Sequence, residues 1–134
     1  MANHGAGTGG HGSCGSTGGG AAALASGEVW LAHGTDHAGS LRRPATYCSV
    51  VGMRPSPGRV ATQPGSPMDR LLSVQGPMAR TVEDAALFLD ALSGEDRRDP
   101  VSLPKPATSF LTAARSGWRP TRVAFSADLG ITPV

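Results

Sequence analysis

GSCGSTGGGAAALASG, residues 12–27, places a cluster of glycines directly before a run of alanines. Glycine costs backbone entropy and adds no packing, so a cluster is expected where the backbone needs a conformation that only glycine tolerates or approaches another group closely. The alanines favour a helix, and Ser16 and Thr17 are residue types that begin helices. The stretch therefore predicts a tight turn at Ser16, a helix from about residue 18 and a stop at Gly27.

The composition indicates a chain rich in turns, long enough for one domain. Its 134 residues include 19 Gly and 11 Pro, about twice the usual combined share. The net charge is +2, and the arginines form scattered pairs without interleaved aromatic residues, so we expect no nucleic-acid partner. Residues 1–20 lack a signal-peptide pattern and no apolar run is long enough to span a bilayer, so we expect a cytoplasmic protein with no membrane partner.

Two further patterns in the glycine-rich start are weak. The sequence GAGTGG at 5–10 matches a dinucleotide-binding fingerprint, but no strand precedes it, so we reject that interpretation. The spacing of His4, His11 and Cys14 matches no established zinc pattern. We expect no metal and no cofactor, and we interpret Cys14 and Cys48 as free thiols because a lone pair of cysteines without a secretory signal fits a reducing compartment.

Apolar spacing predicts one strand and one strong helix beyond the alanine run. Residues 28–36, EVWLAHGTD, predict a short buried strand because positions 29–32 form a continuous apolar run. Residues 81–94 predict the best helix of the chain. Thr81 and Asp84 form an N-terminal box there, and apolar residues recur at helical spacing.

The last third of the chain carries weaker signals. Residues 107–117 predict a short helix, and residues 121–126, TRVAFS, predict a strand. Strands that alternate with helices indicate an α/β layer structure, but two or three strands are too few for a stable sheet alone. We therefore expect an irregular glycine-rich lead-in at 1–12 and one partial domain at 13–134 that belongs to a larger fold.

Two glycine turns each hold a serine. Ser16 precedes the first predicted helix, where backbone N–H groups favour developing negative charge. Ser40 ends a second glycine turn, GTDHAGSLR at 34–42, directly after the predicted strand. Two serines on tight turns can converge on a hydrolytic site. From the residues alone, the alternative that Ser40 is only a helix N-cap stays open.

Two stretches resemble a known family. GSTGGGAAALASGEVWLAHGTDHAGSLRRPATYCSVVGMRPSPGRV, residues 15–60, resembles the signature segment of the amidase signature family, and LSVQGPMARTVEDAALFLDAL, residues 72–92, is similar to the helix-bearing stretch that follows it. The resemblance begins at about Ser13 and covers a minor, central part of a full-length member. The pattern is specific because Ser16 and Ser40 lie 24 residues apart and precede a cysteine, a valine pair, Gly-x-Arg-Pro and Gly-Arg-Val in that order.

This resemblance implies a chemistry and a fold. It implies a fragment of an α/β/α layered fold with a mixed sheet and a Ser, cis-Ser, Lys triad that hydrolyses the C–N bond of a small-molecule amide through an acyl-enzyme. Ser40 corresponds to the nucleophile, and Ser16 to the bridging serine, held in a cis peptide with Gly15. N–H groups of the turn from His37 through Ser40, including those of Ala38 and Gly39, would form the oxyanion hole.

The resemblance also implies supporting residues. These are Gly15, Thr17, Gly18, Asp36 and Arg42. We interpret Asp36 and Arg42 as an ion pair that steadies the turn rather than as substrate contacts. Ala38 stands where family members usually have glycine, and its Cβ is harmless only if its φ is negative.

The triad is incomplete in this sequence. Family members carry the lysine many tens of residues before the bridging serine, whereas here the residues before Ser16 include no lysine, and the single one, Lys105, lies on the other side. We expect a truncated amidase that is inactive alone and self-associates through partly exposed apolar positions such as Leu89 and Leu92. The alternative is a non-catalytic remnant or a subunit-like interaction piece.

Overall fold

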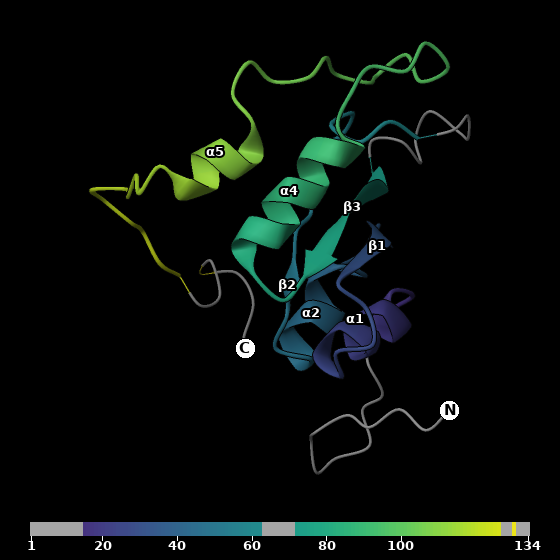
Figure 1. Ribbon diagram of the computed structural model, residues 1–134, viewed down its shortest axis with the longest axis vertical. Coiled ribbons are helices and arrows are strands. Elements are labelled where there is room, and N and C mark those ends of the chain that lie inside the picture. The colour runs from purple at the N-terminus through teal and green to yellow at the C-terminus, as the bar shows by residue number, and fades with distance from the viewer. Residues whose placement is uncertain (1–14, 63–71, 127–129, 131–134) are drawn as a thin grey trace.

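The structure, a computed structural model, describes residues 15–62, 72–126 and 130. A small sheet lies between helices: α1 and α2 pack together on one side of it, and α4 runs along β3 on the other (Figure 1). The elements in chain order are α1 (Gly18–Ala25), β1 (Leu31–Asp36), α2 (Arg42–Tyr47), β2 (Val51–Gly52), β3 (Val74–Ala79), α4 (Val82–Leu92) and α5 (Phe110–Arg115). The described residues thus form an α/β layer arrangement.

The sheet has the strand order β1-β3-β2, and both pairings in the described residues are antiparallel. β3 pairs with the full length of β1, from Leu31 opposite Ala79 to Asp36 opposite Val74. A proline is normally excluded from a central strand because it lacks an N–H. β2 pairs with β3 only through Val51 and Gly52, so Pro77 lies just beyond this pairing. The carbonyl of Pro77 accepts the N–H of Met53 at 3.0 Å, but proline has no N–H to return, and the pairing ends there.

The hydrophobic core lies between β3 and the first two helices. Five residues, each less than 5% exposed, form it: Ala21, Leu24, Leu41, Ala45 and Met78. Cys48, a free thiol, packs at its edge. Apolar burial of this kind is the dominant favourable term in folding, so the core fixes the two helices against the sheet.

Three predicted helices are confirmed. α1 begins at Gly18 as the glycine and alanine pattern predicts. α4 begins after Thr81, whose hydroxyl accepts the N–H of Asp84 at 3.1 Å. The weaker helix at 107–117 is present as the shorter α5. None of the helices in the described ranges is long and apolar enough to cross a membrane.

The predicted buried strand at 28–36 is wrong in its first half. β1 begins at Leu31, and Trp30 is 81% exposed. β1 is an edge strand covered by α1, so its side chains alternate between buried and exposed instead of forming a continuous buried run. Arg80 instead lies over the Trp30 ring, 5.2 Å from the ring centroid.

Two other predictions are corrected in the second half of the chain. Residues 121–126 are not a strand, because none of the described strands pairs with them, and Phe125 is 91% exposed. Leu89 is fully buried rather than partly exposed, because β3 and α5 cover that side of α4. Leu92 is half-buried as expected. The lead-in at 1–12, with His4 and His11, lies outside the described residues, as does Cys14.

Candidate active site

The two glycine turns meet in space. Gly15 has φ +135, and a Cβ added to it would lie 3.1 Å from the Cα of Ser40. The N–H of Gly18 donates to the carbonyl of Gly15 at 3.1 Å and closes the first turn ahead of α1. Both reasons for a glycine therefore apply at Gly15, a left-handed backbone and a close approach to another segment. The turn that holds Ser16 lies against the turn that holds Ser40.

Neither serine hydroxyl serves as a helix cap. α2 has no side-chain capping bond, so the N-cap interpretation of Ser40 is wrong. Thr17 occupies the N-cap position of α1, but its hydroxyl donates to the carbonyl of Thr35 at 3.4 Å and so ties the turn to β1. Ser16 is exposed and Ser40 is half-buried. Within the described residues the two hydroxyls are not hydrogen-bonded to each other.

The cis peptide that the resemblance implies is not found. Every peptide bond among the described residues is trans, including the bond between Gly15 and Ser16. The left-handed backbone of Gly15 reverses the chain instead.

The turn from Asp36 to Ser40 presents backbone N–H groups unequally. The N–H of Gly39 donates to Oδ1 of Asp36 at 2.8 Å and is therefore engaged. In the described part of the chain, the N–H groups of His37, Ala38 and Ser40 make no hydrogen bond. Ala38 does not have a positive φ, so its Cβ causes no backbone strain, and Gly39 takes the left-handed position at φ +101.

Asp36 organises this turn from its buried carboxylate. The side chain is fully buried, and Oδ2 accepts the N–H of Leu41 at 3.3 Å and of Arg42 at 3.4 Å. The guanidinium of Arg42 donates to both carboxylate oxygens, from Nε at 2.9 Å and Nη2 at 3.1 Å. This bonding to Arg42 holds the pKa of Asp36 well below its ordinary value; burial opposes the shift, and the N–H donors reinforce it. The predicted ion pair of Asp36 and Arg42 is confirmed.

A second arginine on Asp36 was not predicted from the sequence. Arg54 donates from Nη1 to Oδ1 of Asp36 at 3.0 Å and to the backbone carbonyl of Asp36. Its Nη2 donates to the carbonyl of Leu72 at 2.9 Å. The one available signal was the Gly-x-Arg-Pro pattern at 52–55, which does not reveal the partner.

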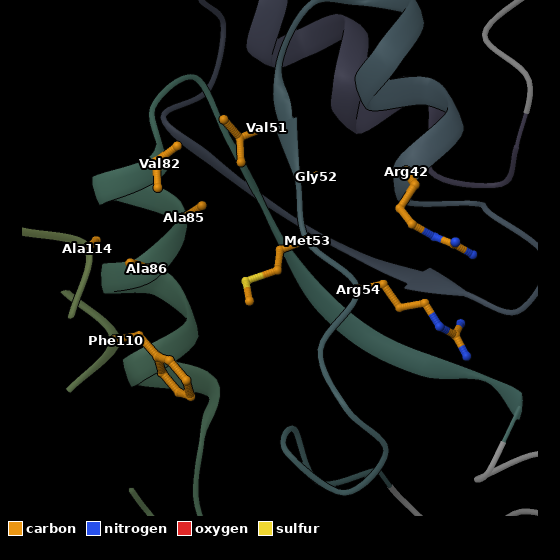
Figure 2. A pocket seen from close by; sticks show the side chains of 10 residues that line it. All are labelled: Arg42, Val51, Gly52, Met53, Arg54, Val82, Ala85, Ala86, Phe110 and Ala114. Carbon is orange, nitrogen blue, oxygen red and sulfur yellow. The ribbon is translucent and has the colours of Figure 1, made fainter. Parts of the chain in front are cut away.

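A hollow of about 410 Å³ opens on the α4 side of β2 (Figure 2). Its lining residues are Arg42, Val51, Gly52, Met53, Arg54, Val82, Ala85, Ala86, Phe110 and Ala114. The guanidinium groups of Arg42 and Arg54 lie on one side and point away from the apolar wall (Figure 2). Neither Ser16 nor Ser40 lines it, so this hollow is not a cavity around the two serines.

The single lysine of the chain, Lys105, lies beside Gly94 rather than in either serine turn. Lys105 is exposed, and its Cε lies 3.8 Å from the position of a Cβ on Gly94, beyond the end of α4. The segment after α4 lies at the end of the molecule opposite to α1 and α2 (Figure 1). Among the described side chains, no group of three or more His, Cys, Asp or Glu is arranged to hold a metal ion.

Several known proteins are similar to this chain in sequence and in fold. A glutamyl-tRNA(Gln) amidotransferase subunit of Rubrobacter xylanophilus is 41% identical over 115 residues, 86% of this chain and 24% of that protein. A solved bacterial aryl acylamidase of the amidase signature family superposes with a TM-score of 0.79 at 41% identity, over 90% of this chain and 25% of that one. A peptide amidase of Stenotrophomonas maltophilia gives 0.65 at 38% identity, over 73% of this chain and 20% of its own.

The chain thus spans about a quarter of the length of these relatives. The family model described as Amidase matches residues 9–134, which include both serine turns, the sheet and all of the helices described above. The chain therefore belongs to the amidase signature family.

Proposed function

We propose that this chain supplies the nucleophile segment of an amidase-type hydrolase, with Ser40 as nucleophile and Ser16 as the bridging serine. The observation that carries the proposal is the approach of the two turns, in which the backbone of Gly15 packs against Ser40. Both hydroxyls are free of capping bonds and so are available for proton transfer. A structural serine at a helix start is normally engaged with the helix N–H groups.

The proposed reaction proceeds in two halves. Ser40 Oγ attacks the amide carbon, and its proton passes through Ser16 to a neutral lysine. The tetrahedral oxyanion is stabilised by the unengaged N–H groups of His37, Ala38 and Ser40. The C–N bond then breaks, the amine leaves with a proton, and water hydrolyses the Ser40 ester to the acid and free enzyme. Gly39 acts as a turn residue, since its N–H is bound to Asp36.

The lysine that accepts the proton in this reaction must come from polypeptide outside this segment. A serine hydroxyl is a weak nucleophile until a base takes its proton, and Lys105 lies beside Gly94, beyond α4. We therefore propose that the 134-residue chain alone does not turn over amides, and that activity requires polypeptide corresponding to the part of the relatives that it does not span.

A second candidate is a non-catalytic or subunit-like role. It is favoured by the 41% identity to an amidotransferase protein that is named as one part of an assembly. The two candidates differ in whether the Ser40 turn is competent for chemistry. The small-molecule amide remains the proposed substrate class for the hydrolase.

A segment exchange distinguishes the two candidates. The matched quarter of the bacterial aryl acylamidase is replaced by this chain, so that the host provides the remaining fold and its own base. We expect the chimera to hydrolyse an aryl amide and to react with a fluorophosphonate at Ser40, read by intact mass. Ser40→Ala should abolish both signals, and removal of one catalytic serine generally costs several orders of magnitude in rate.

Two controls complete the exchange. Cys48→Ala should leave labelling unchanged, because Cys48 packs at the core edge. Ala38→Gly should leave turnover unchanged or raise it. A folded chimera that is neither active nor labelled would favour the non-catalytic role, and labelling that survives Ser40→Ala would refute the nucleophile assignment.

A further inference from the structure

We propose that Arg54 is a positioning residue for Ser40: it holds the end of β1 so that the Asp36 carboxylate keeps the nucleophile turn in place. The inference rests on the proposed function for the role of Ser40. Arg54 makes no hydrogen bond to either serine in the described structure, so it acts through Asp36.

The first step of the argument is the place of Ser40 between two anchored neighbours. Gly39 and Leu41, the residues on either side of it, both donate their N–H groups to the Asp36 carboxylate, at 2.8 and 3.3 Å. Any shift of that carboxylate therefore moves both ends of the Ser40 peptide unit. Because Gly15 packs against the Ser40 backbone, the same shift also changes its distance from the Ser16 turn.

The second step is that the two arginines hold Asp36 differently. Arg42 is the first residue of α2, directly after the turn, and its side chain is 55% exposed. Arg54 comes from the loop after β2, 18 residues along the chain, and its side chain is 24% exposed. Arg54 therefore links the Asp36 carboxylate to a segment outside the turn.

The third step is the set of acceptors that Arg54 joins. One guanidinium binds the carboxylate of Asp36, the carbonyl of Asp36 and the carbonyl of Leu72, which precedes β3. The planar fork of an arginine suits such a multiple contact better than a single ammonium. Because Asp36 is fully buried, water does not readily take the place of the Arg54 guanidinium when Arg54 is substituted.

The test is hydrogen exchange of backbone amides in the full chain, followed by NMR for Arg54→Met. We expect the amides of Gly39 and Leu41 to exchange at least ~10-fold faster, because the turn opens locally without global unfolding. The amide of Ser93, which donates to the carbonyl of Leu89 at the end of α4, reports global stability and should change by less than about twofold.

Two further variants make the result specific. Arg54→Lys keeps one charged donor for Asp36, so it should restore most of the protection at Gly39. Arg59→Met removes a nearby arginine that binds the carbonyl of Pro104 instead, and should leave Gly39 unchanged.

The proposal is overturned if Gly39 and Leu41 are unaffected in Arg54→Met, or if Ser93 accelerates equally with them. Should Arg54→Met not fold, Arg54→Gln, which removes the charge that binds Asp36, decides: faster exchange at Gly39 than at Ser93 supports positioning, and unchanged or uniform exchange overturns it. The measurement needs no turnover, so an inactive chimera in the segment exchange would leave it intact.

Discussion

Two regions of this chain are held together by different forces. In the sheet region, residues 15–62 and 72–93, apolar side chains pack on both faces of β3. In the C-terminal region, residues 94–126, Asp99 is the only buried residue. The sheet region is stabilised by apolar burial, whereas the C-terminal region buries little beyond the packing of α5 on α4 and is otherwise attached through polar contacts.

Those polar contacts are few and specific. The carboxylate of Asp90 in α4 accepts the N–H groups of Phe110 and Leu111 at 2.7 and 3.0 Å and so caps α5. The carboxylate of Asp99 accepts the N–H of Thr62 at 2.8 Å. Hydrogen bonds of this kind orient a segment, but each contributes little net stability. The large side chains beyond α5 stay exposed, including Trp118 at 79%.

The ion pairs of the two regions show the same contrast. The Asp36 side chain is fully buried and bound by two arginines, whereas Asp96 is 32% exposed beside an Arg98 that is 66% exposed. Exposed ion pairs contribute little to the stability of the folded state. Removing one partner of a buried ion pair is costly, because it leaves the other charge buried without a partner. Ion pairs of similar geometry therefore contribute differently to the free energy of unfolding when one is buried and the other is exposed.

The largest expected effect comes from emptying the core of the sheet region. Leu24 is fully buried among Leu41 and Met78, so Leu24→Ala should lower the free energy of unfolding by about 2–5 kcal/mol. Phe125→Ala, in the C-terminal region, should change it by less than about 0.5 kcal/mol. Urea unfolding followed by circular dichroism measures both. Equal losses in the two variants would contradict the division into two regions.

The next effect comes from the buried carboxylate. Asp36→Asn keeps the shape of the side chain but removes the charge that two arginines and three amides bind, and should cost about 2–4 kcal/mol at neutral pH. Because folding lowers the pKa of Asp36, its contribution is complete above the ordinary value of 3.8 and is lost as the pH falls through the lowered pKa.

The matched control is Asp96→Asn, which removes the exposed carboxylate bound by Arg98. It should leave the unfolding curve unchanged at neutral pH. In urea unfolding between pH 7 and 2, the acid loss of stability should be reduced in Asp36→Asn and retained in Asp96→Asn. If the unsubstituted chain, Asp36→Asn and Asp96→Asn lose the same stability on acidification, Asp36 is not the group whose protonation causes the loss.

Local signals predicted α1, α4 and α5, but neither α2 nor β3. The box at Thr81 and Asp84 lies within one turn of α4, so the sequence contains the whole cause of that helix start. β3 was not predicted, because Gly76 and Pro77 are typical of turns. Its conformation depends on partners on both sides, which no local pattern reports. Residues 121–126 have a strand-like pattern but no pairing partner among the described strands, and they are irregular.

The site divides in the same way. The spacing of Ser16 and Ser40, together with the resemblance, identified the two turns. The Asp36–Arg42 pair could be predicted because the two residues flank one short turn. Arg54 could not be predicted, because its contact with Asp36 links two loops through the folded sheet. The cis bond, expected from the resemblance alone, was wrong, because the bond between Gly15 and Ser16 is trans.

The smallest expected effects concern glycines outside the turns, beginning with Gly34 in β1. A Cβ at Gly34 would lie 2.7 Å from Oγ1 of Thr17 and 2.8 Å from Cδ2 of Leu41. These two residues directly follow Ser16 and Ser40, so Gly34 lies beneath both serine turns. Gly34→Ala should cost about 1–3 kcal/mol through overpacking and move the turns apart.

Gly19 is the matched control, because it lies in α1 with no atom within 4 Å of an added Cβ. Gly19→Ala should raise the free energy of unfolding by about 0.5–1 kcal/mol, since alanine favours a helix more than glycine does. Thermal unfolding gives both values, and NMR shifts of Gly15 and Ser40 report the turns, which should move only in Gly34→Ala. If Gly34→Ala leaves these shifts in place, the close packing of β1 is not what holds the two serines together, and the approach of Gly15 to Ser40 must depend on the turns alone.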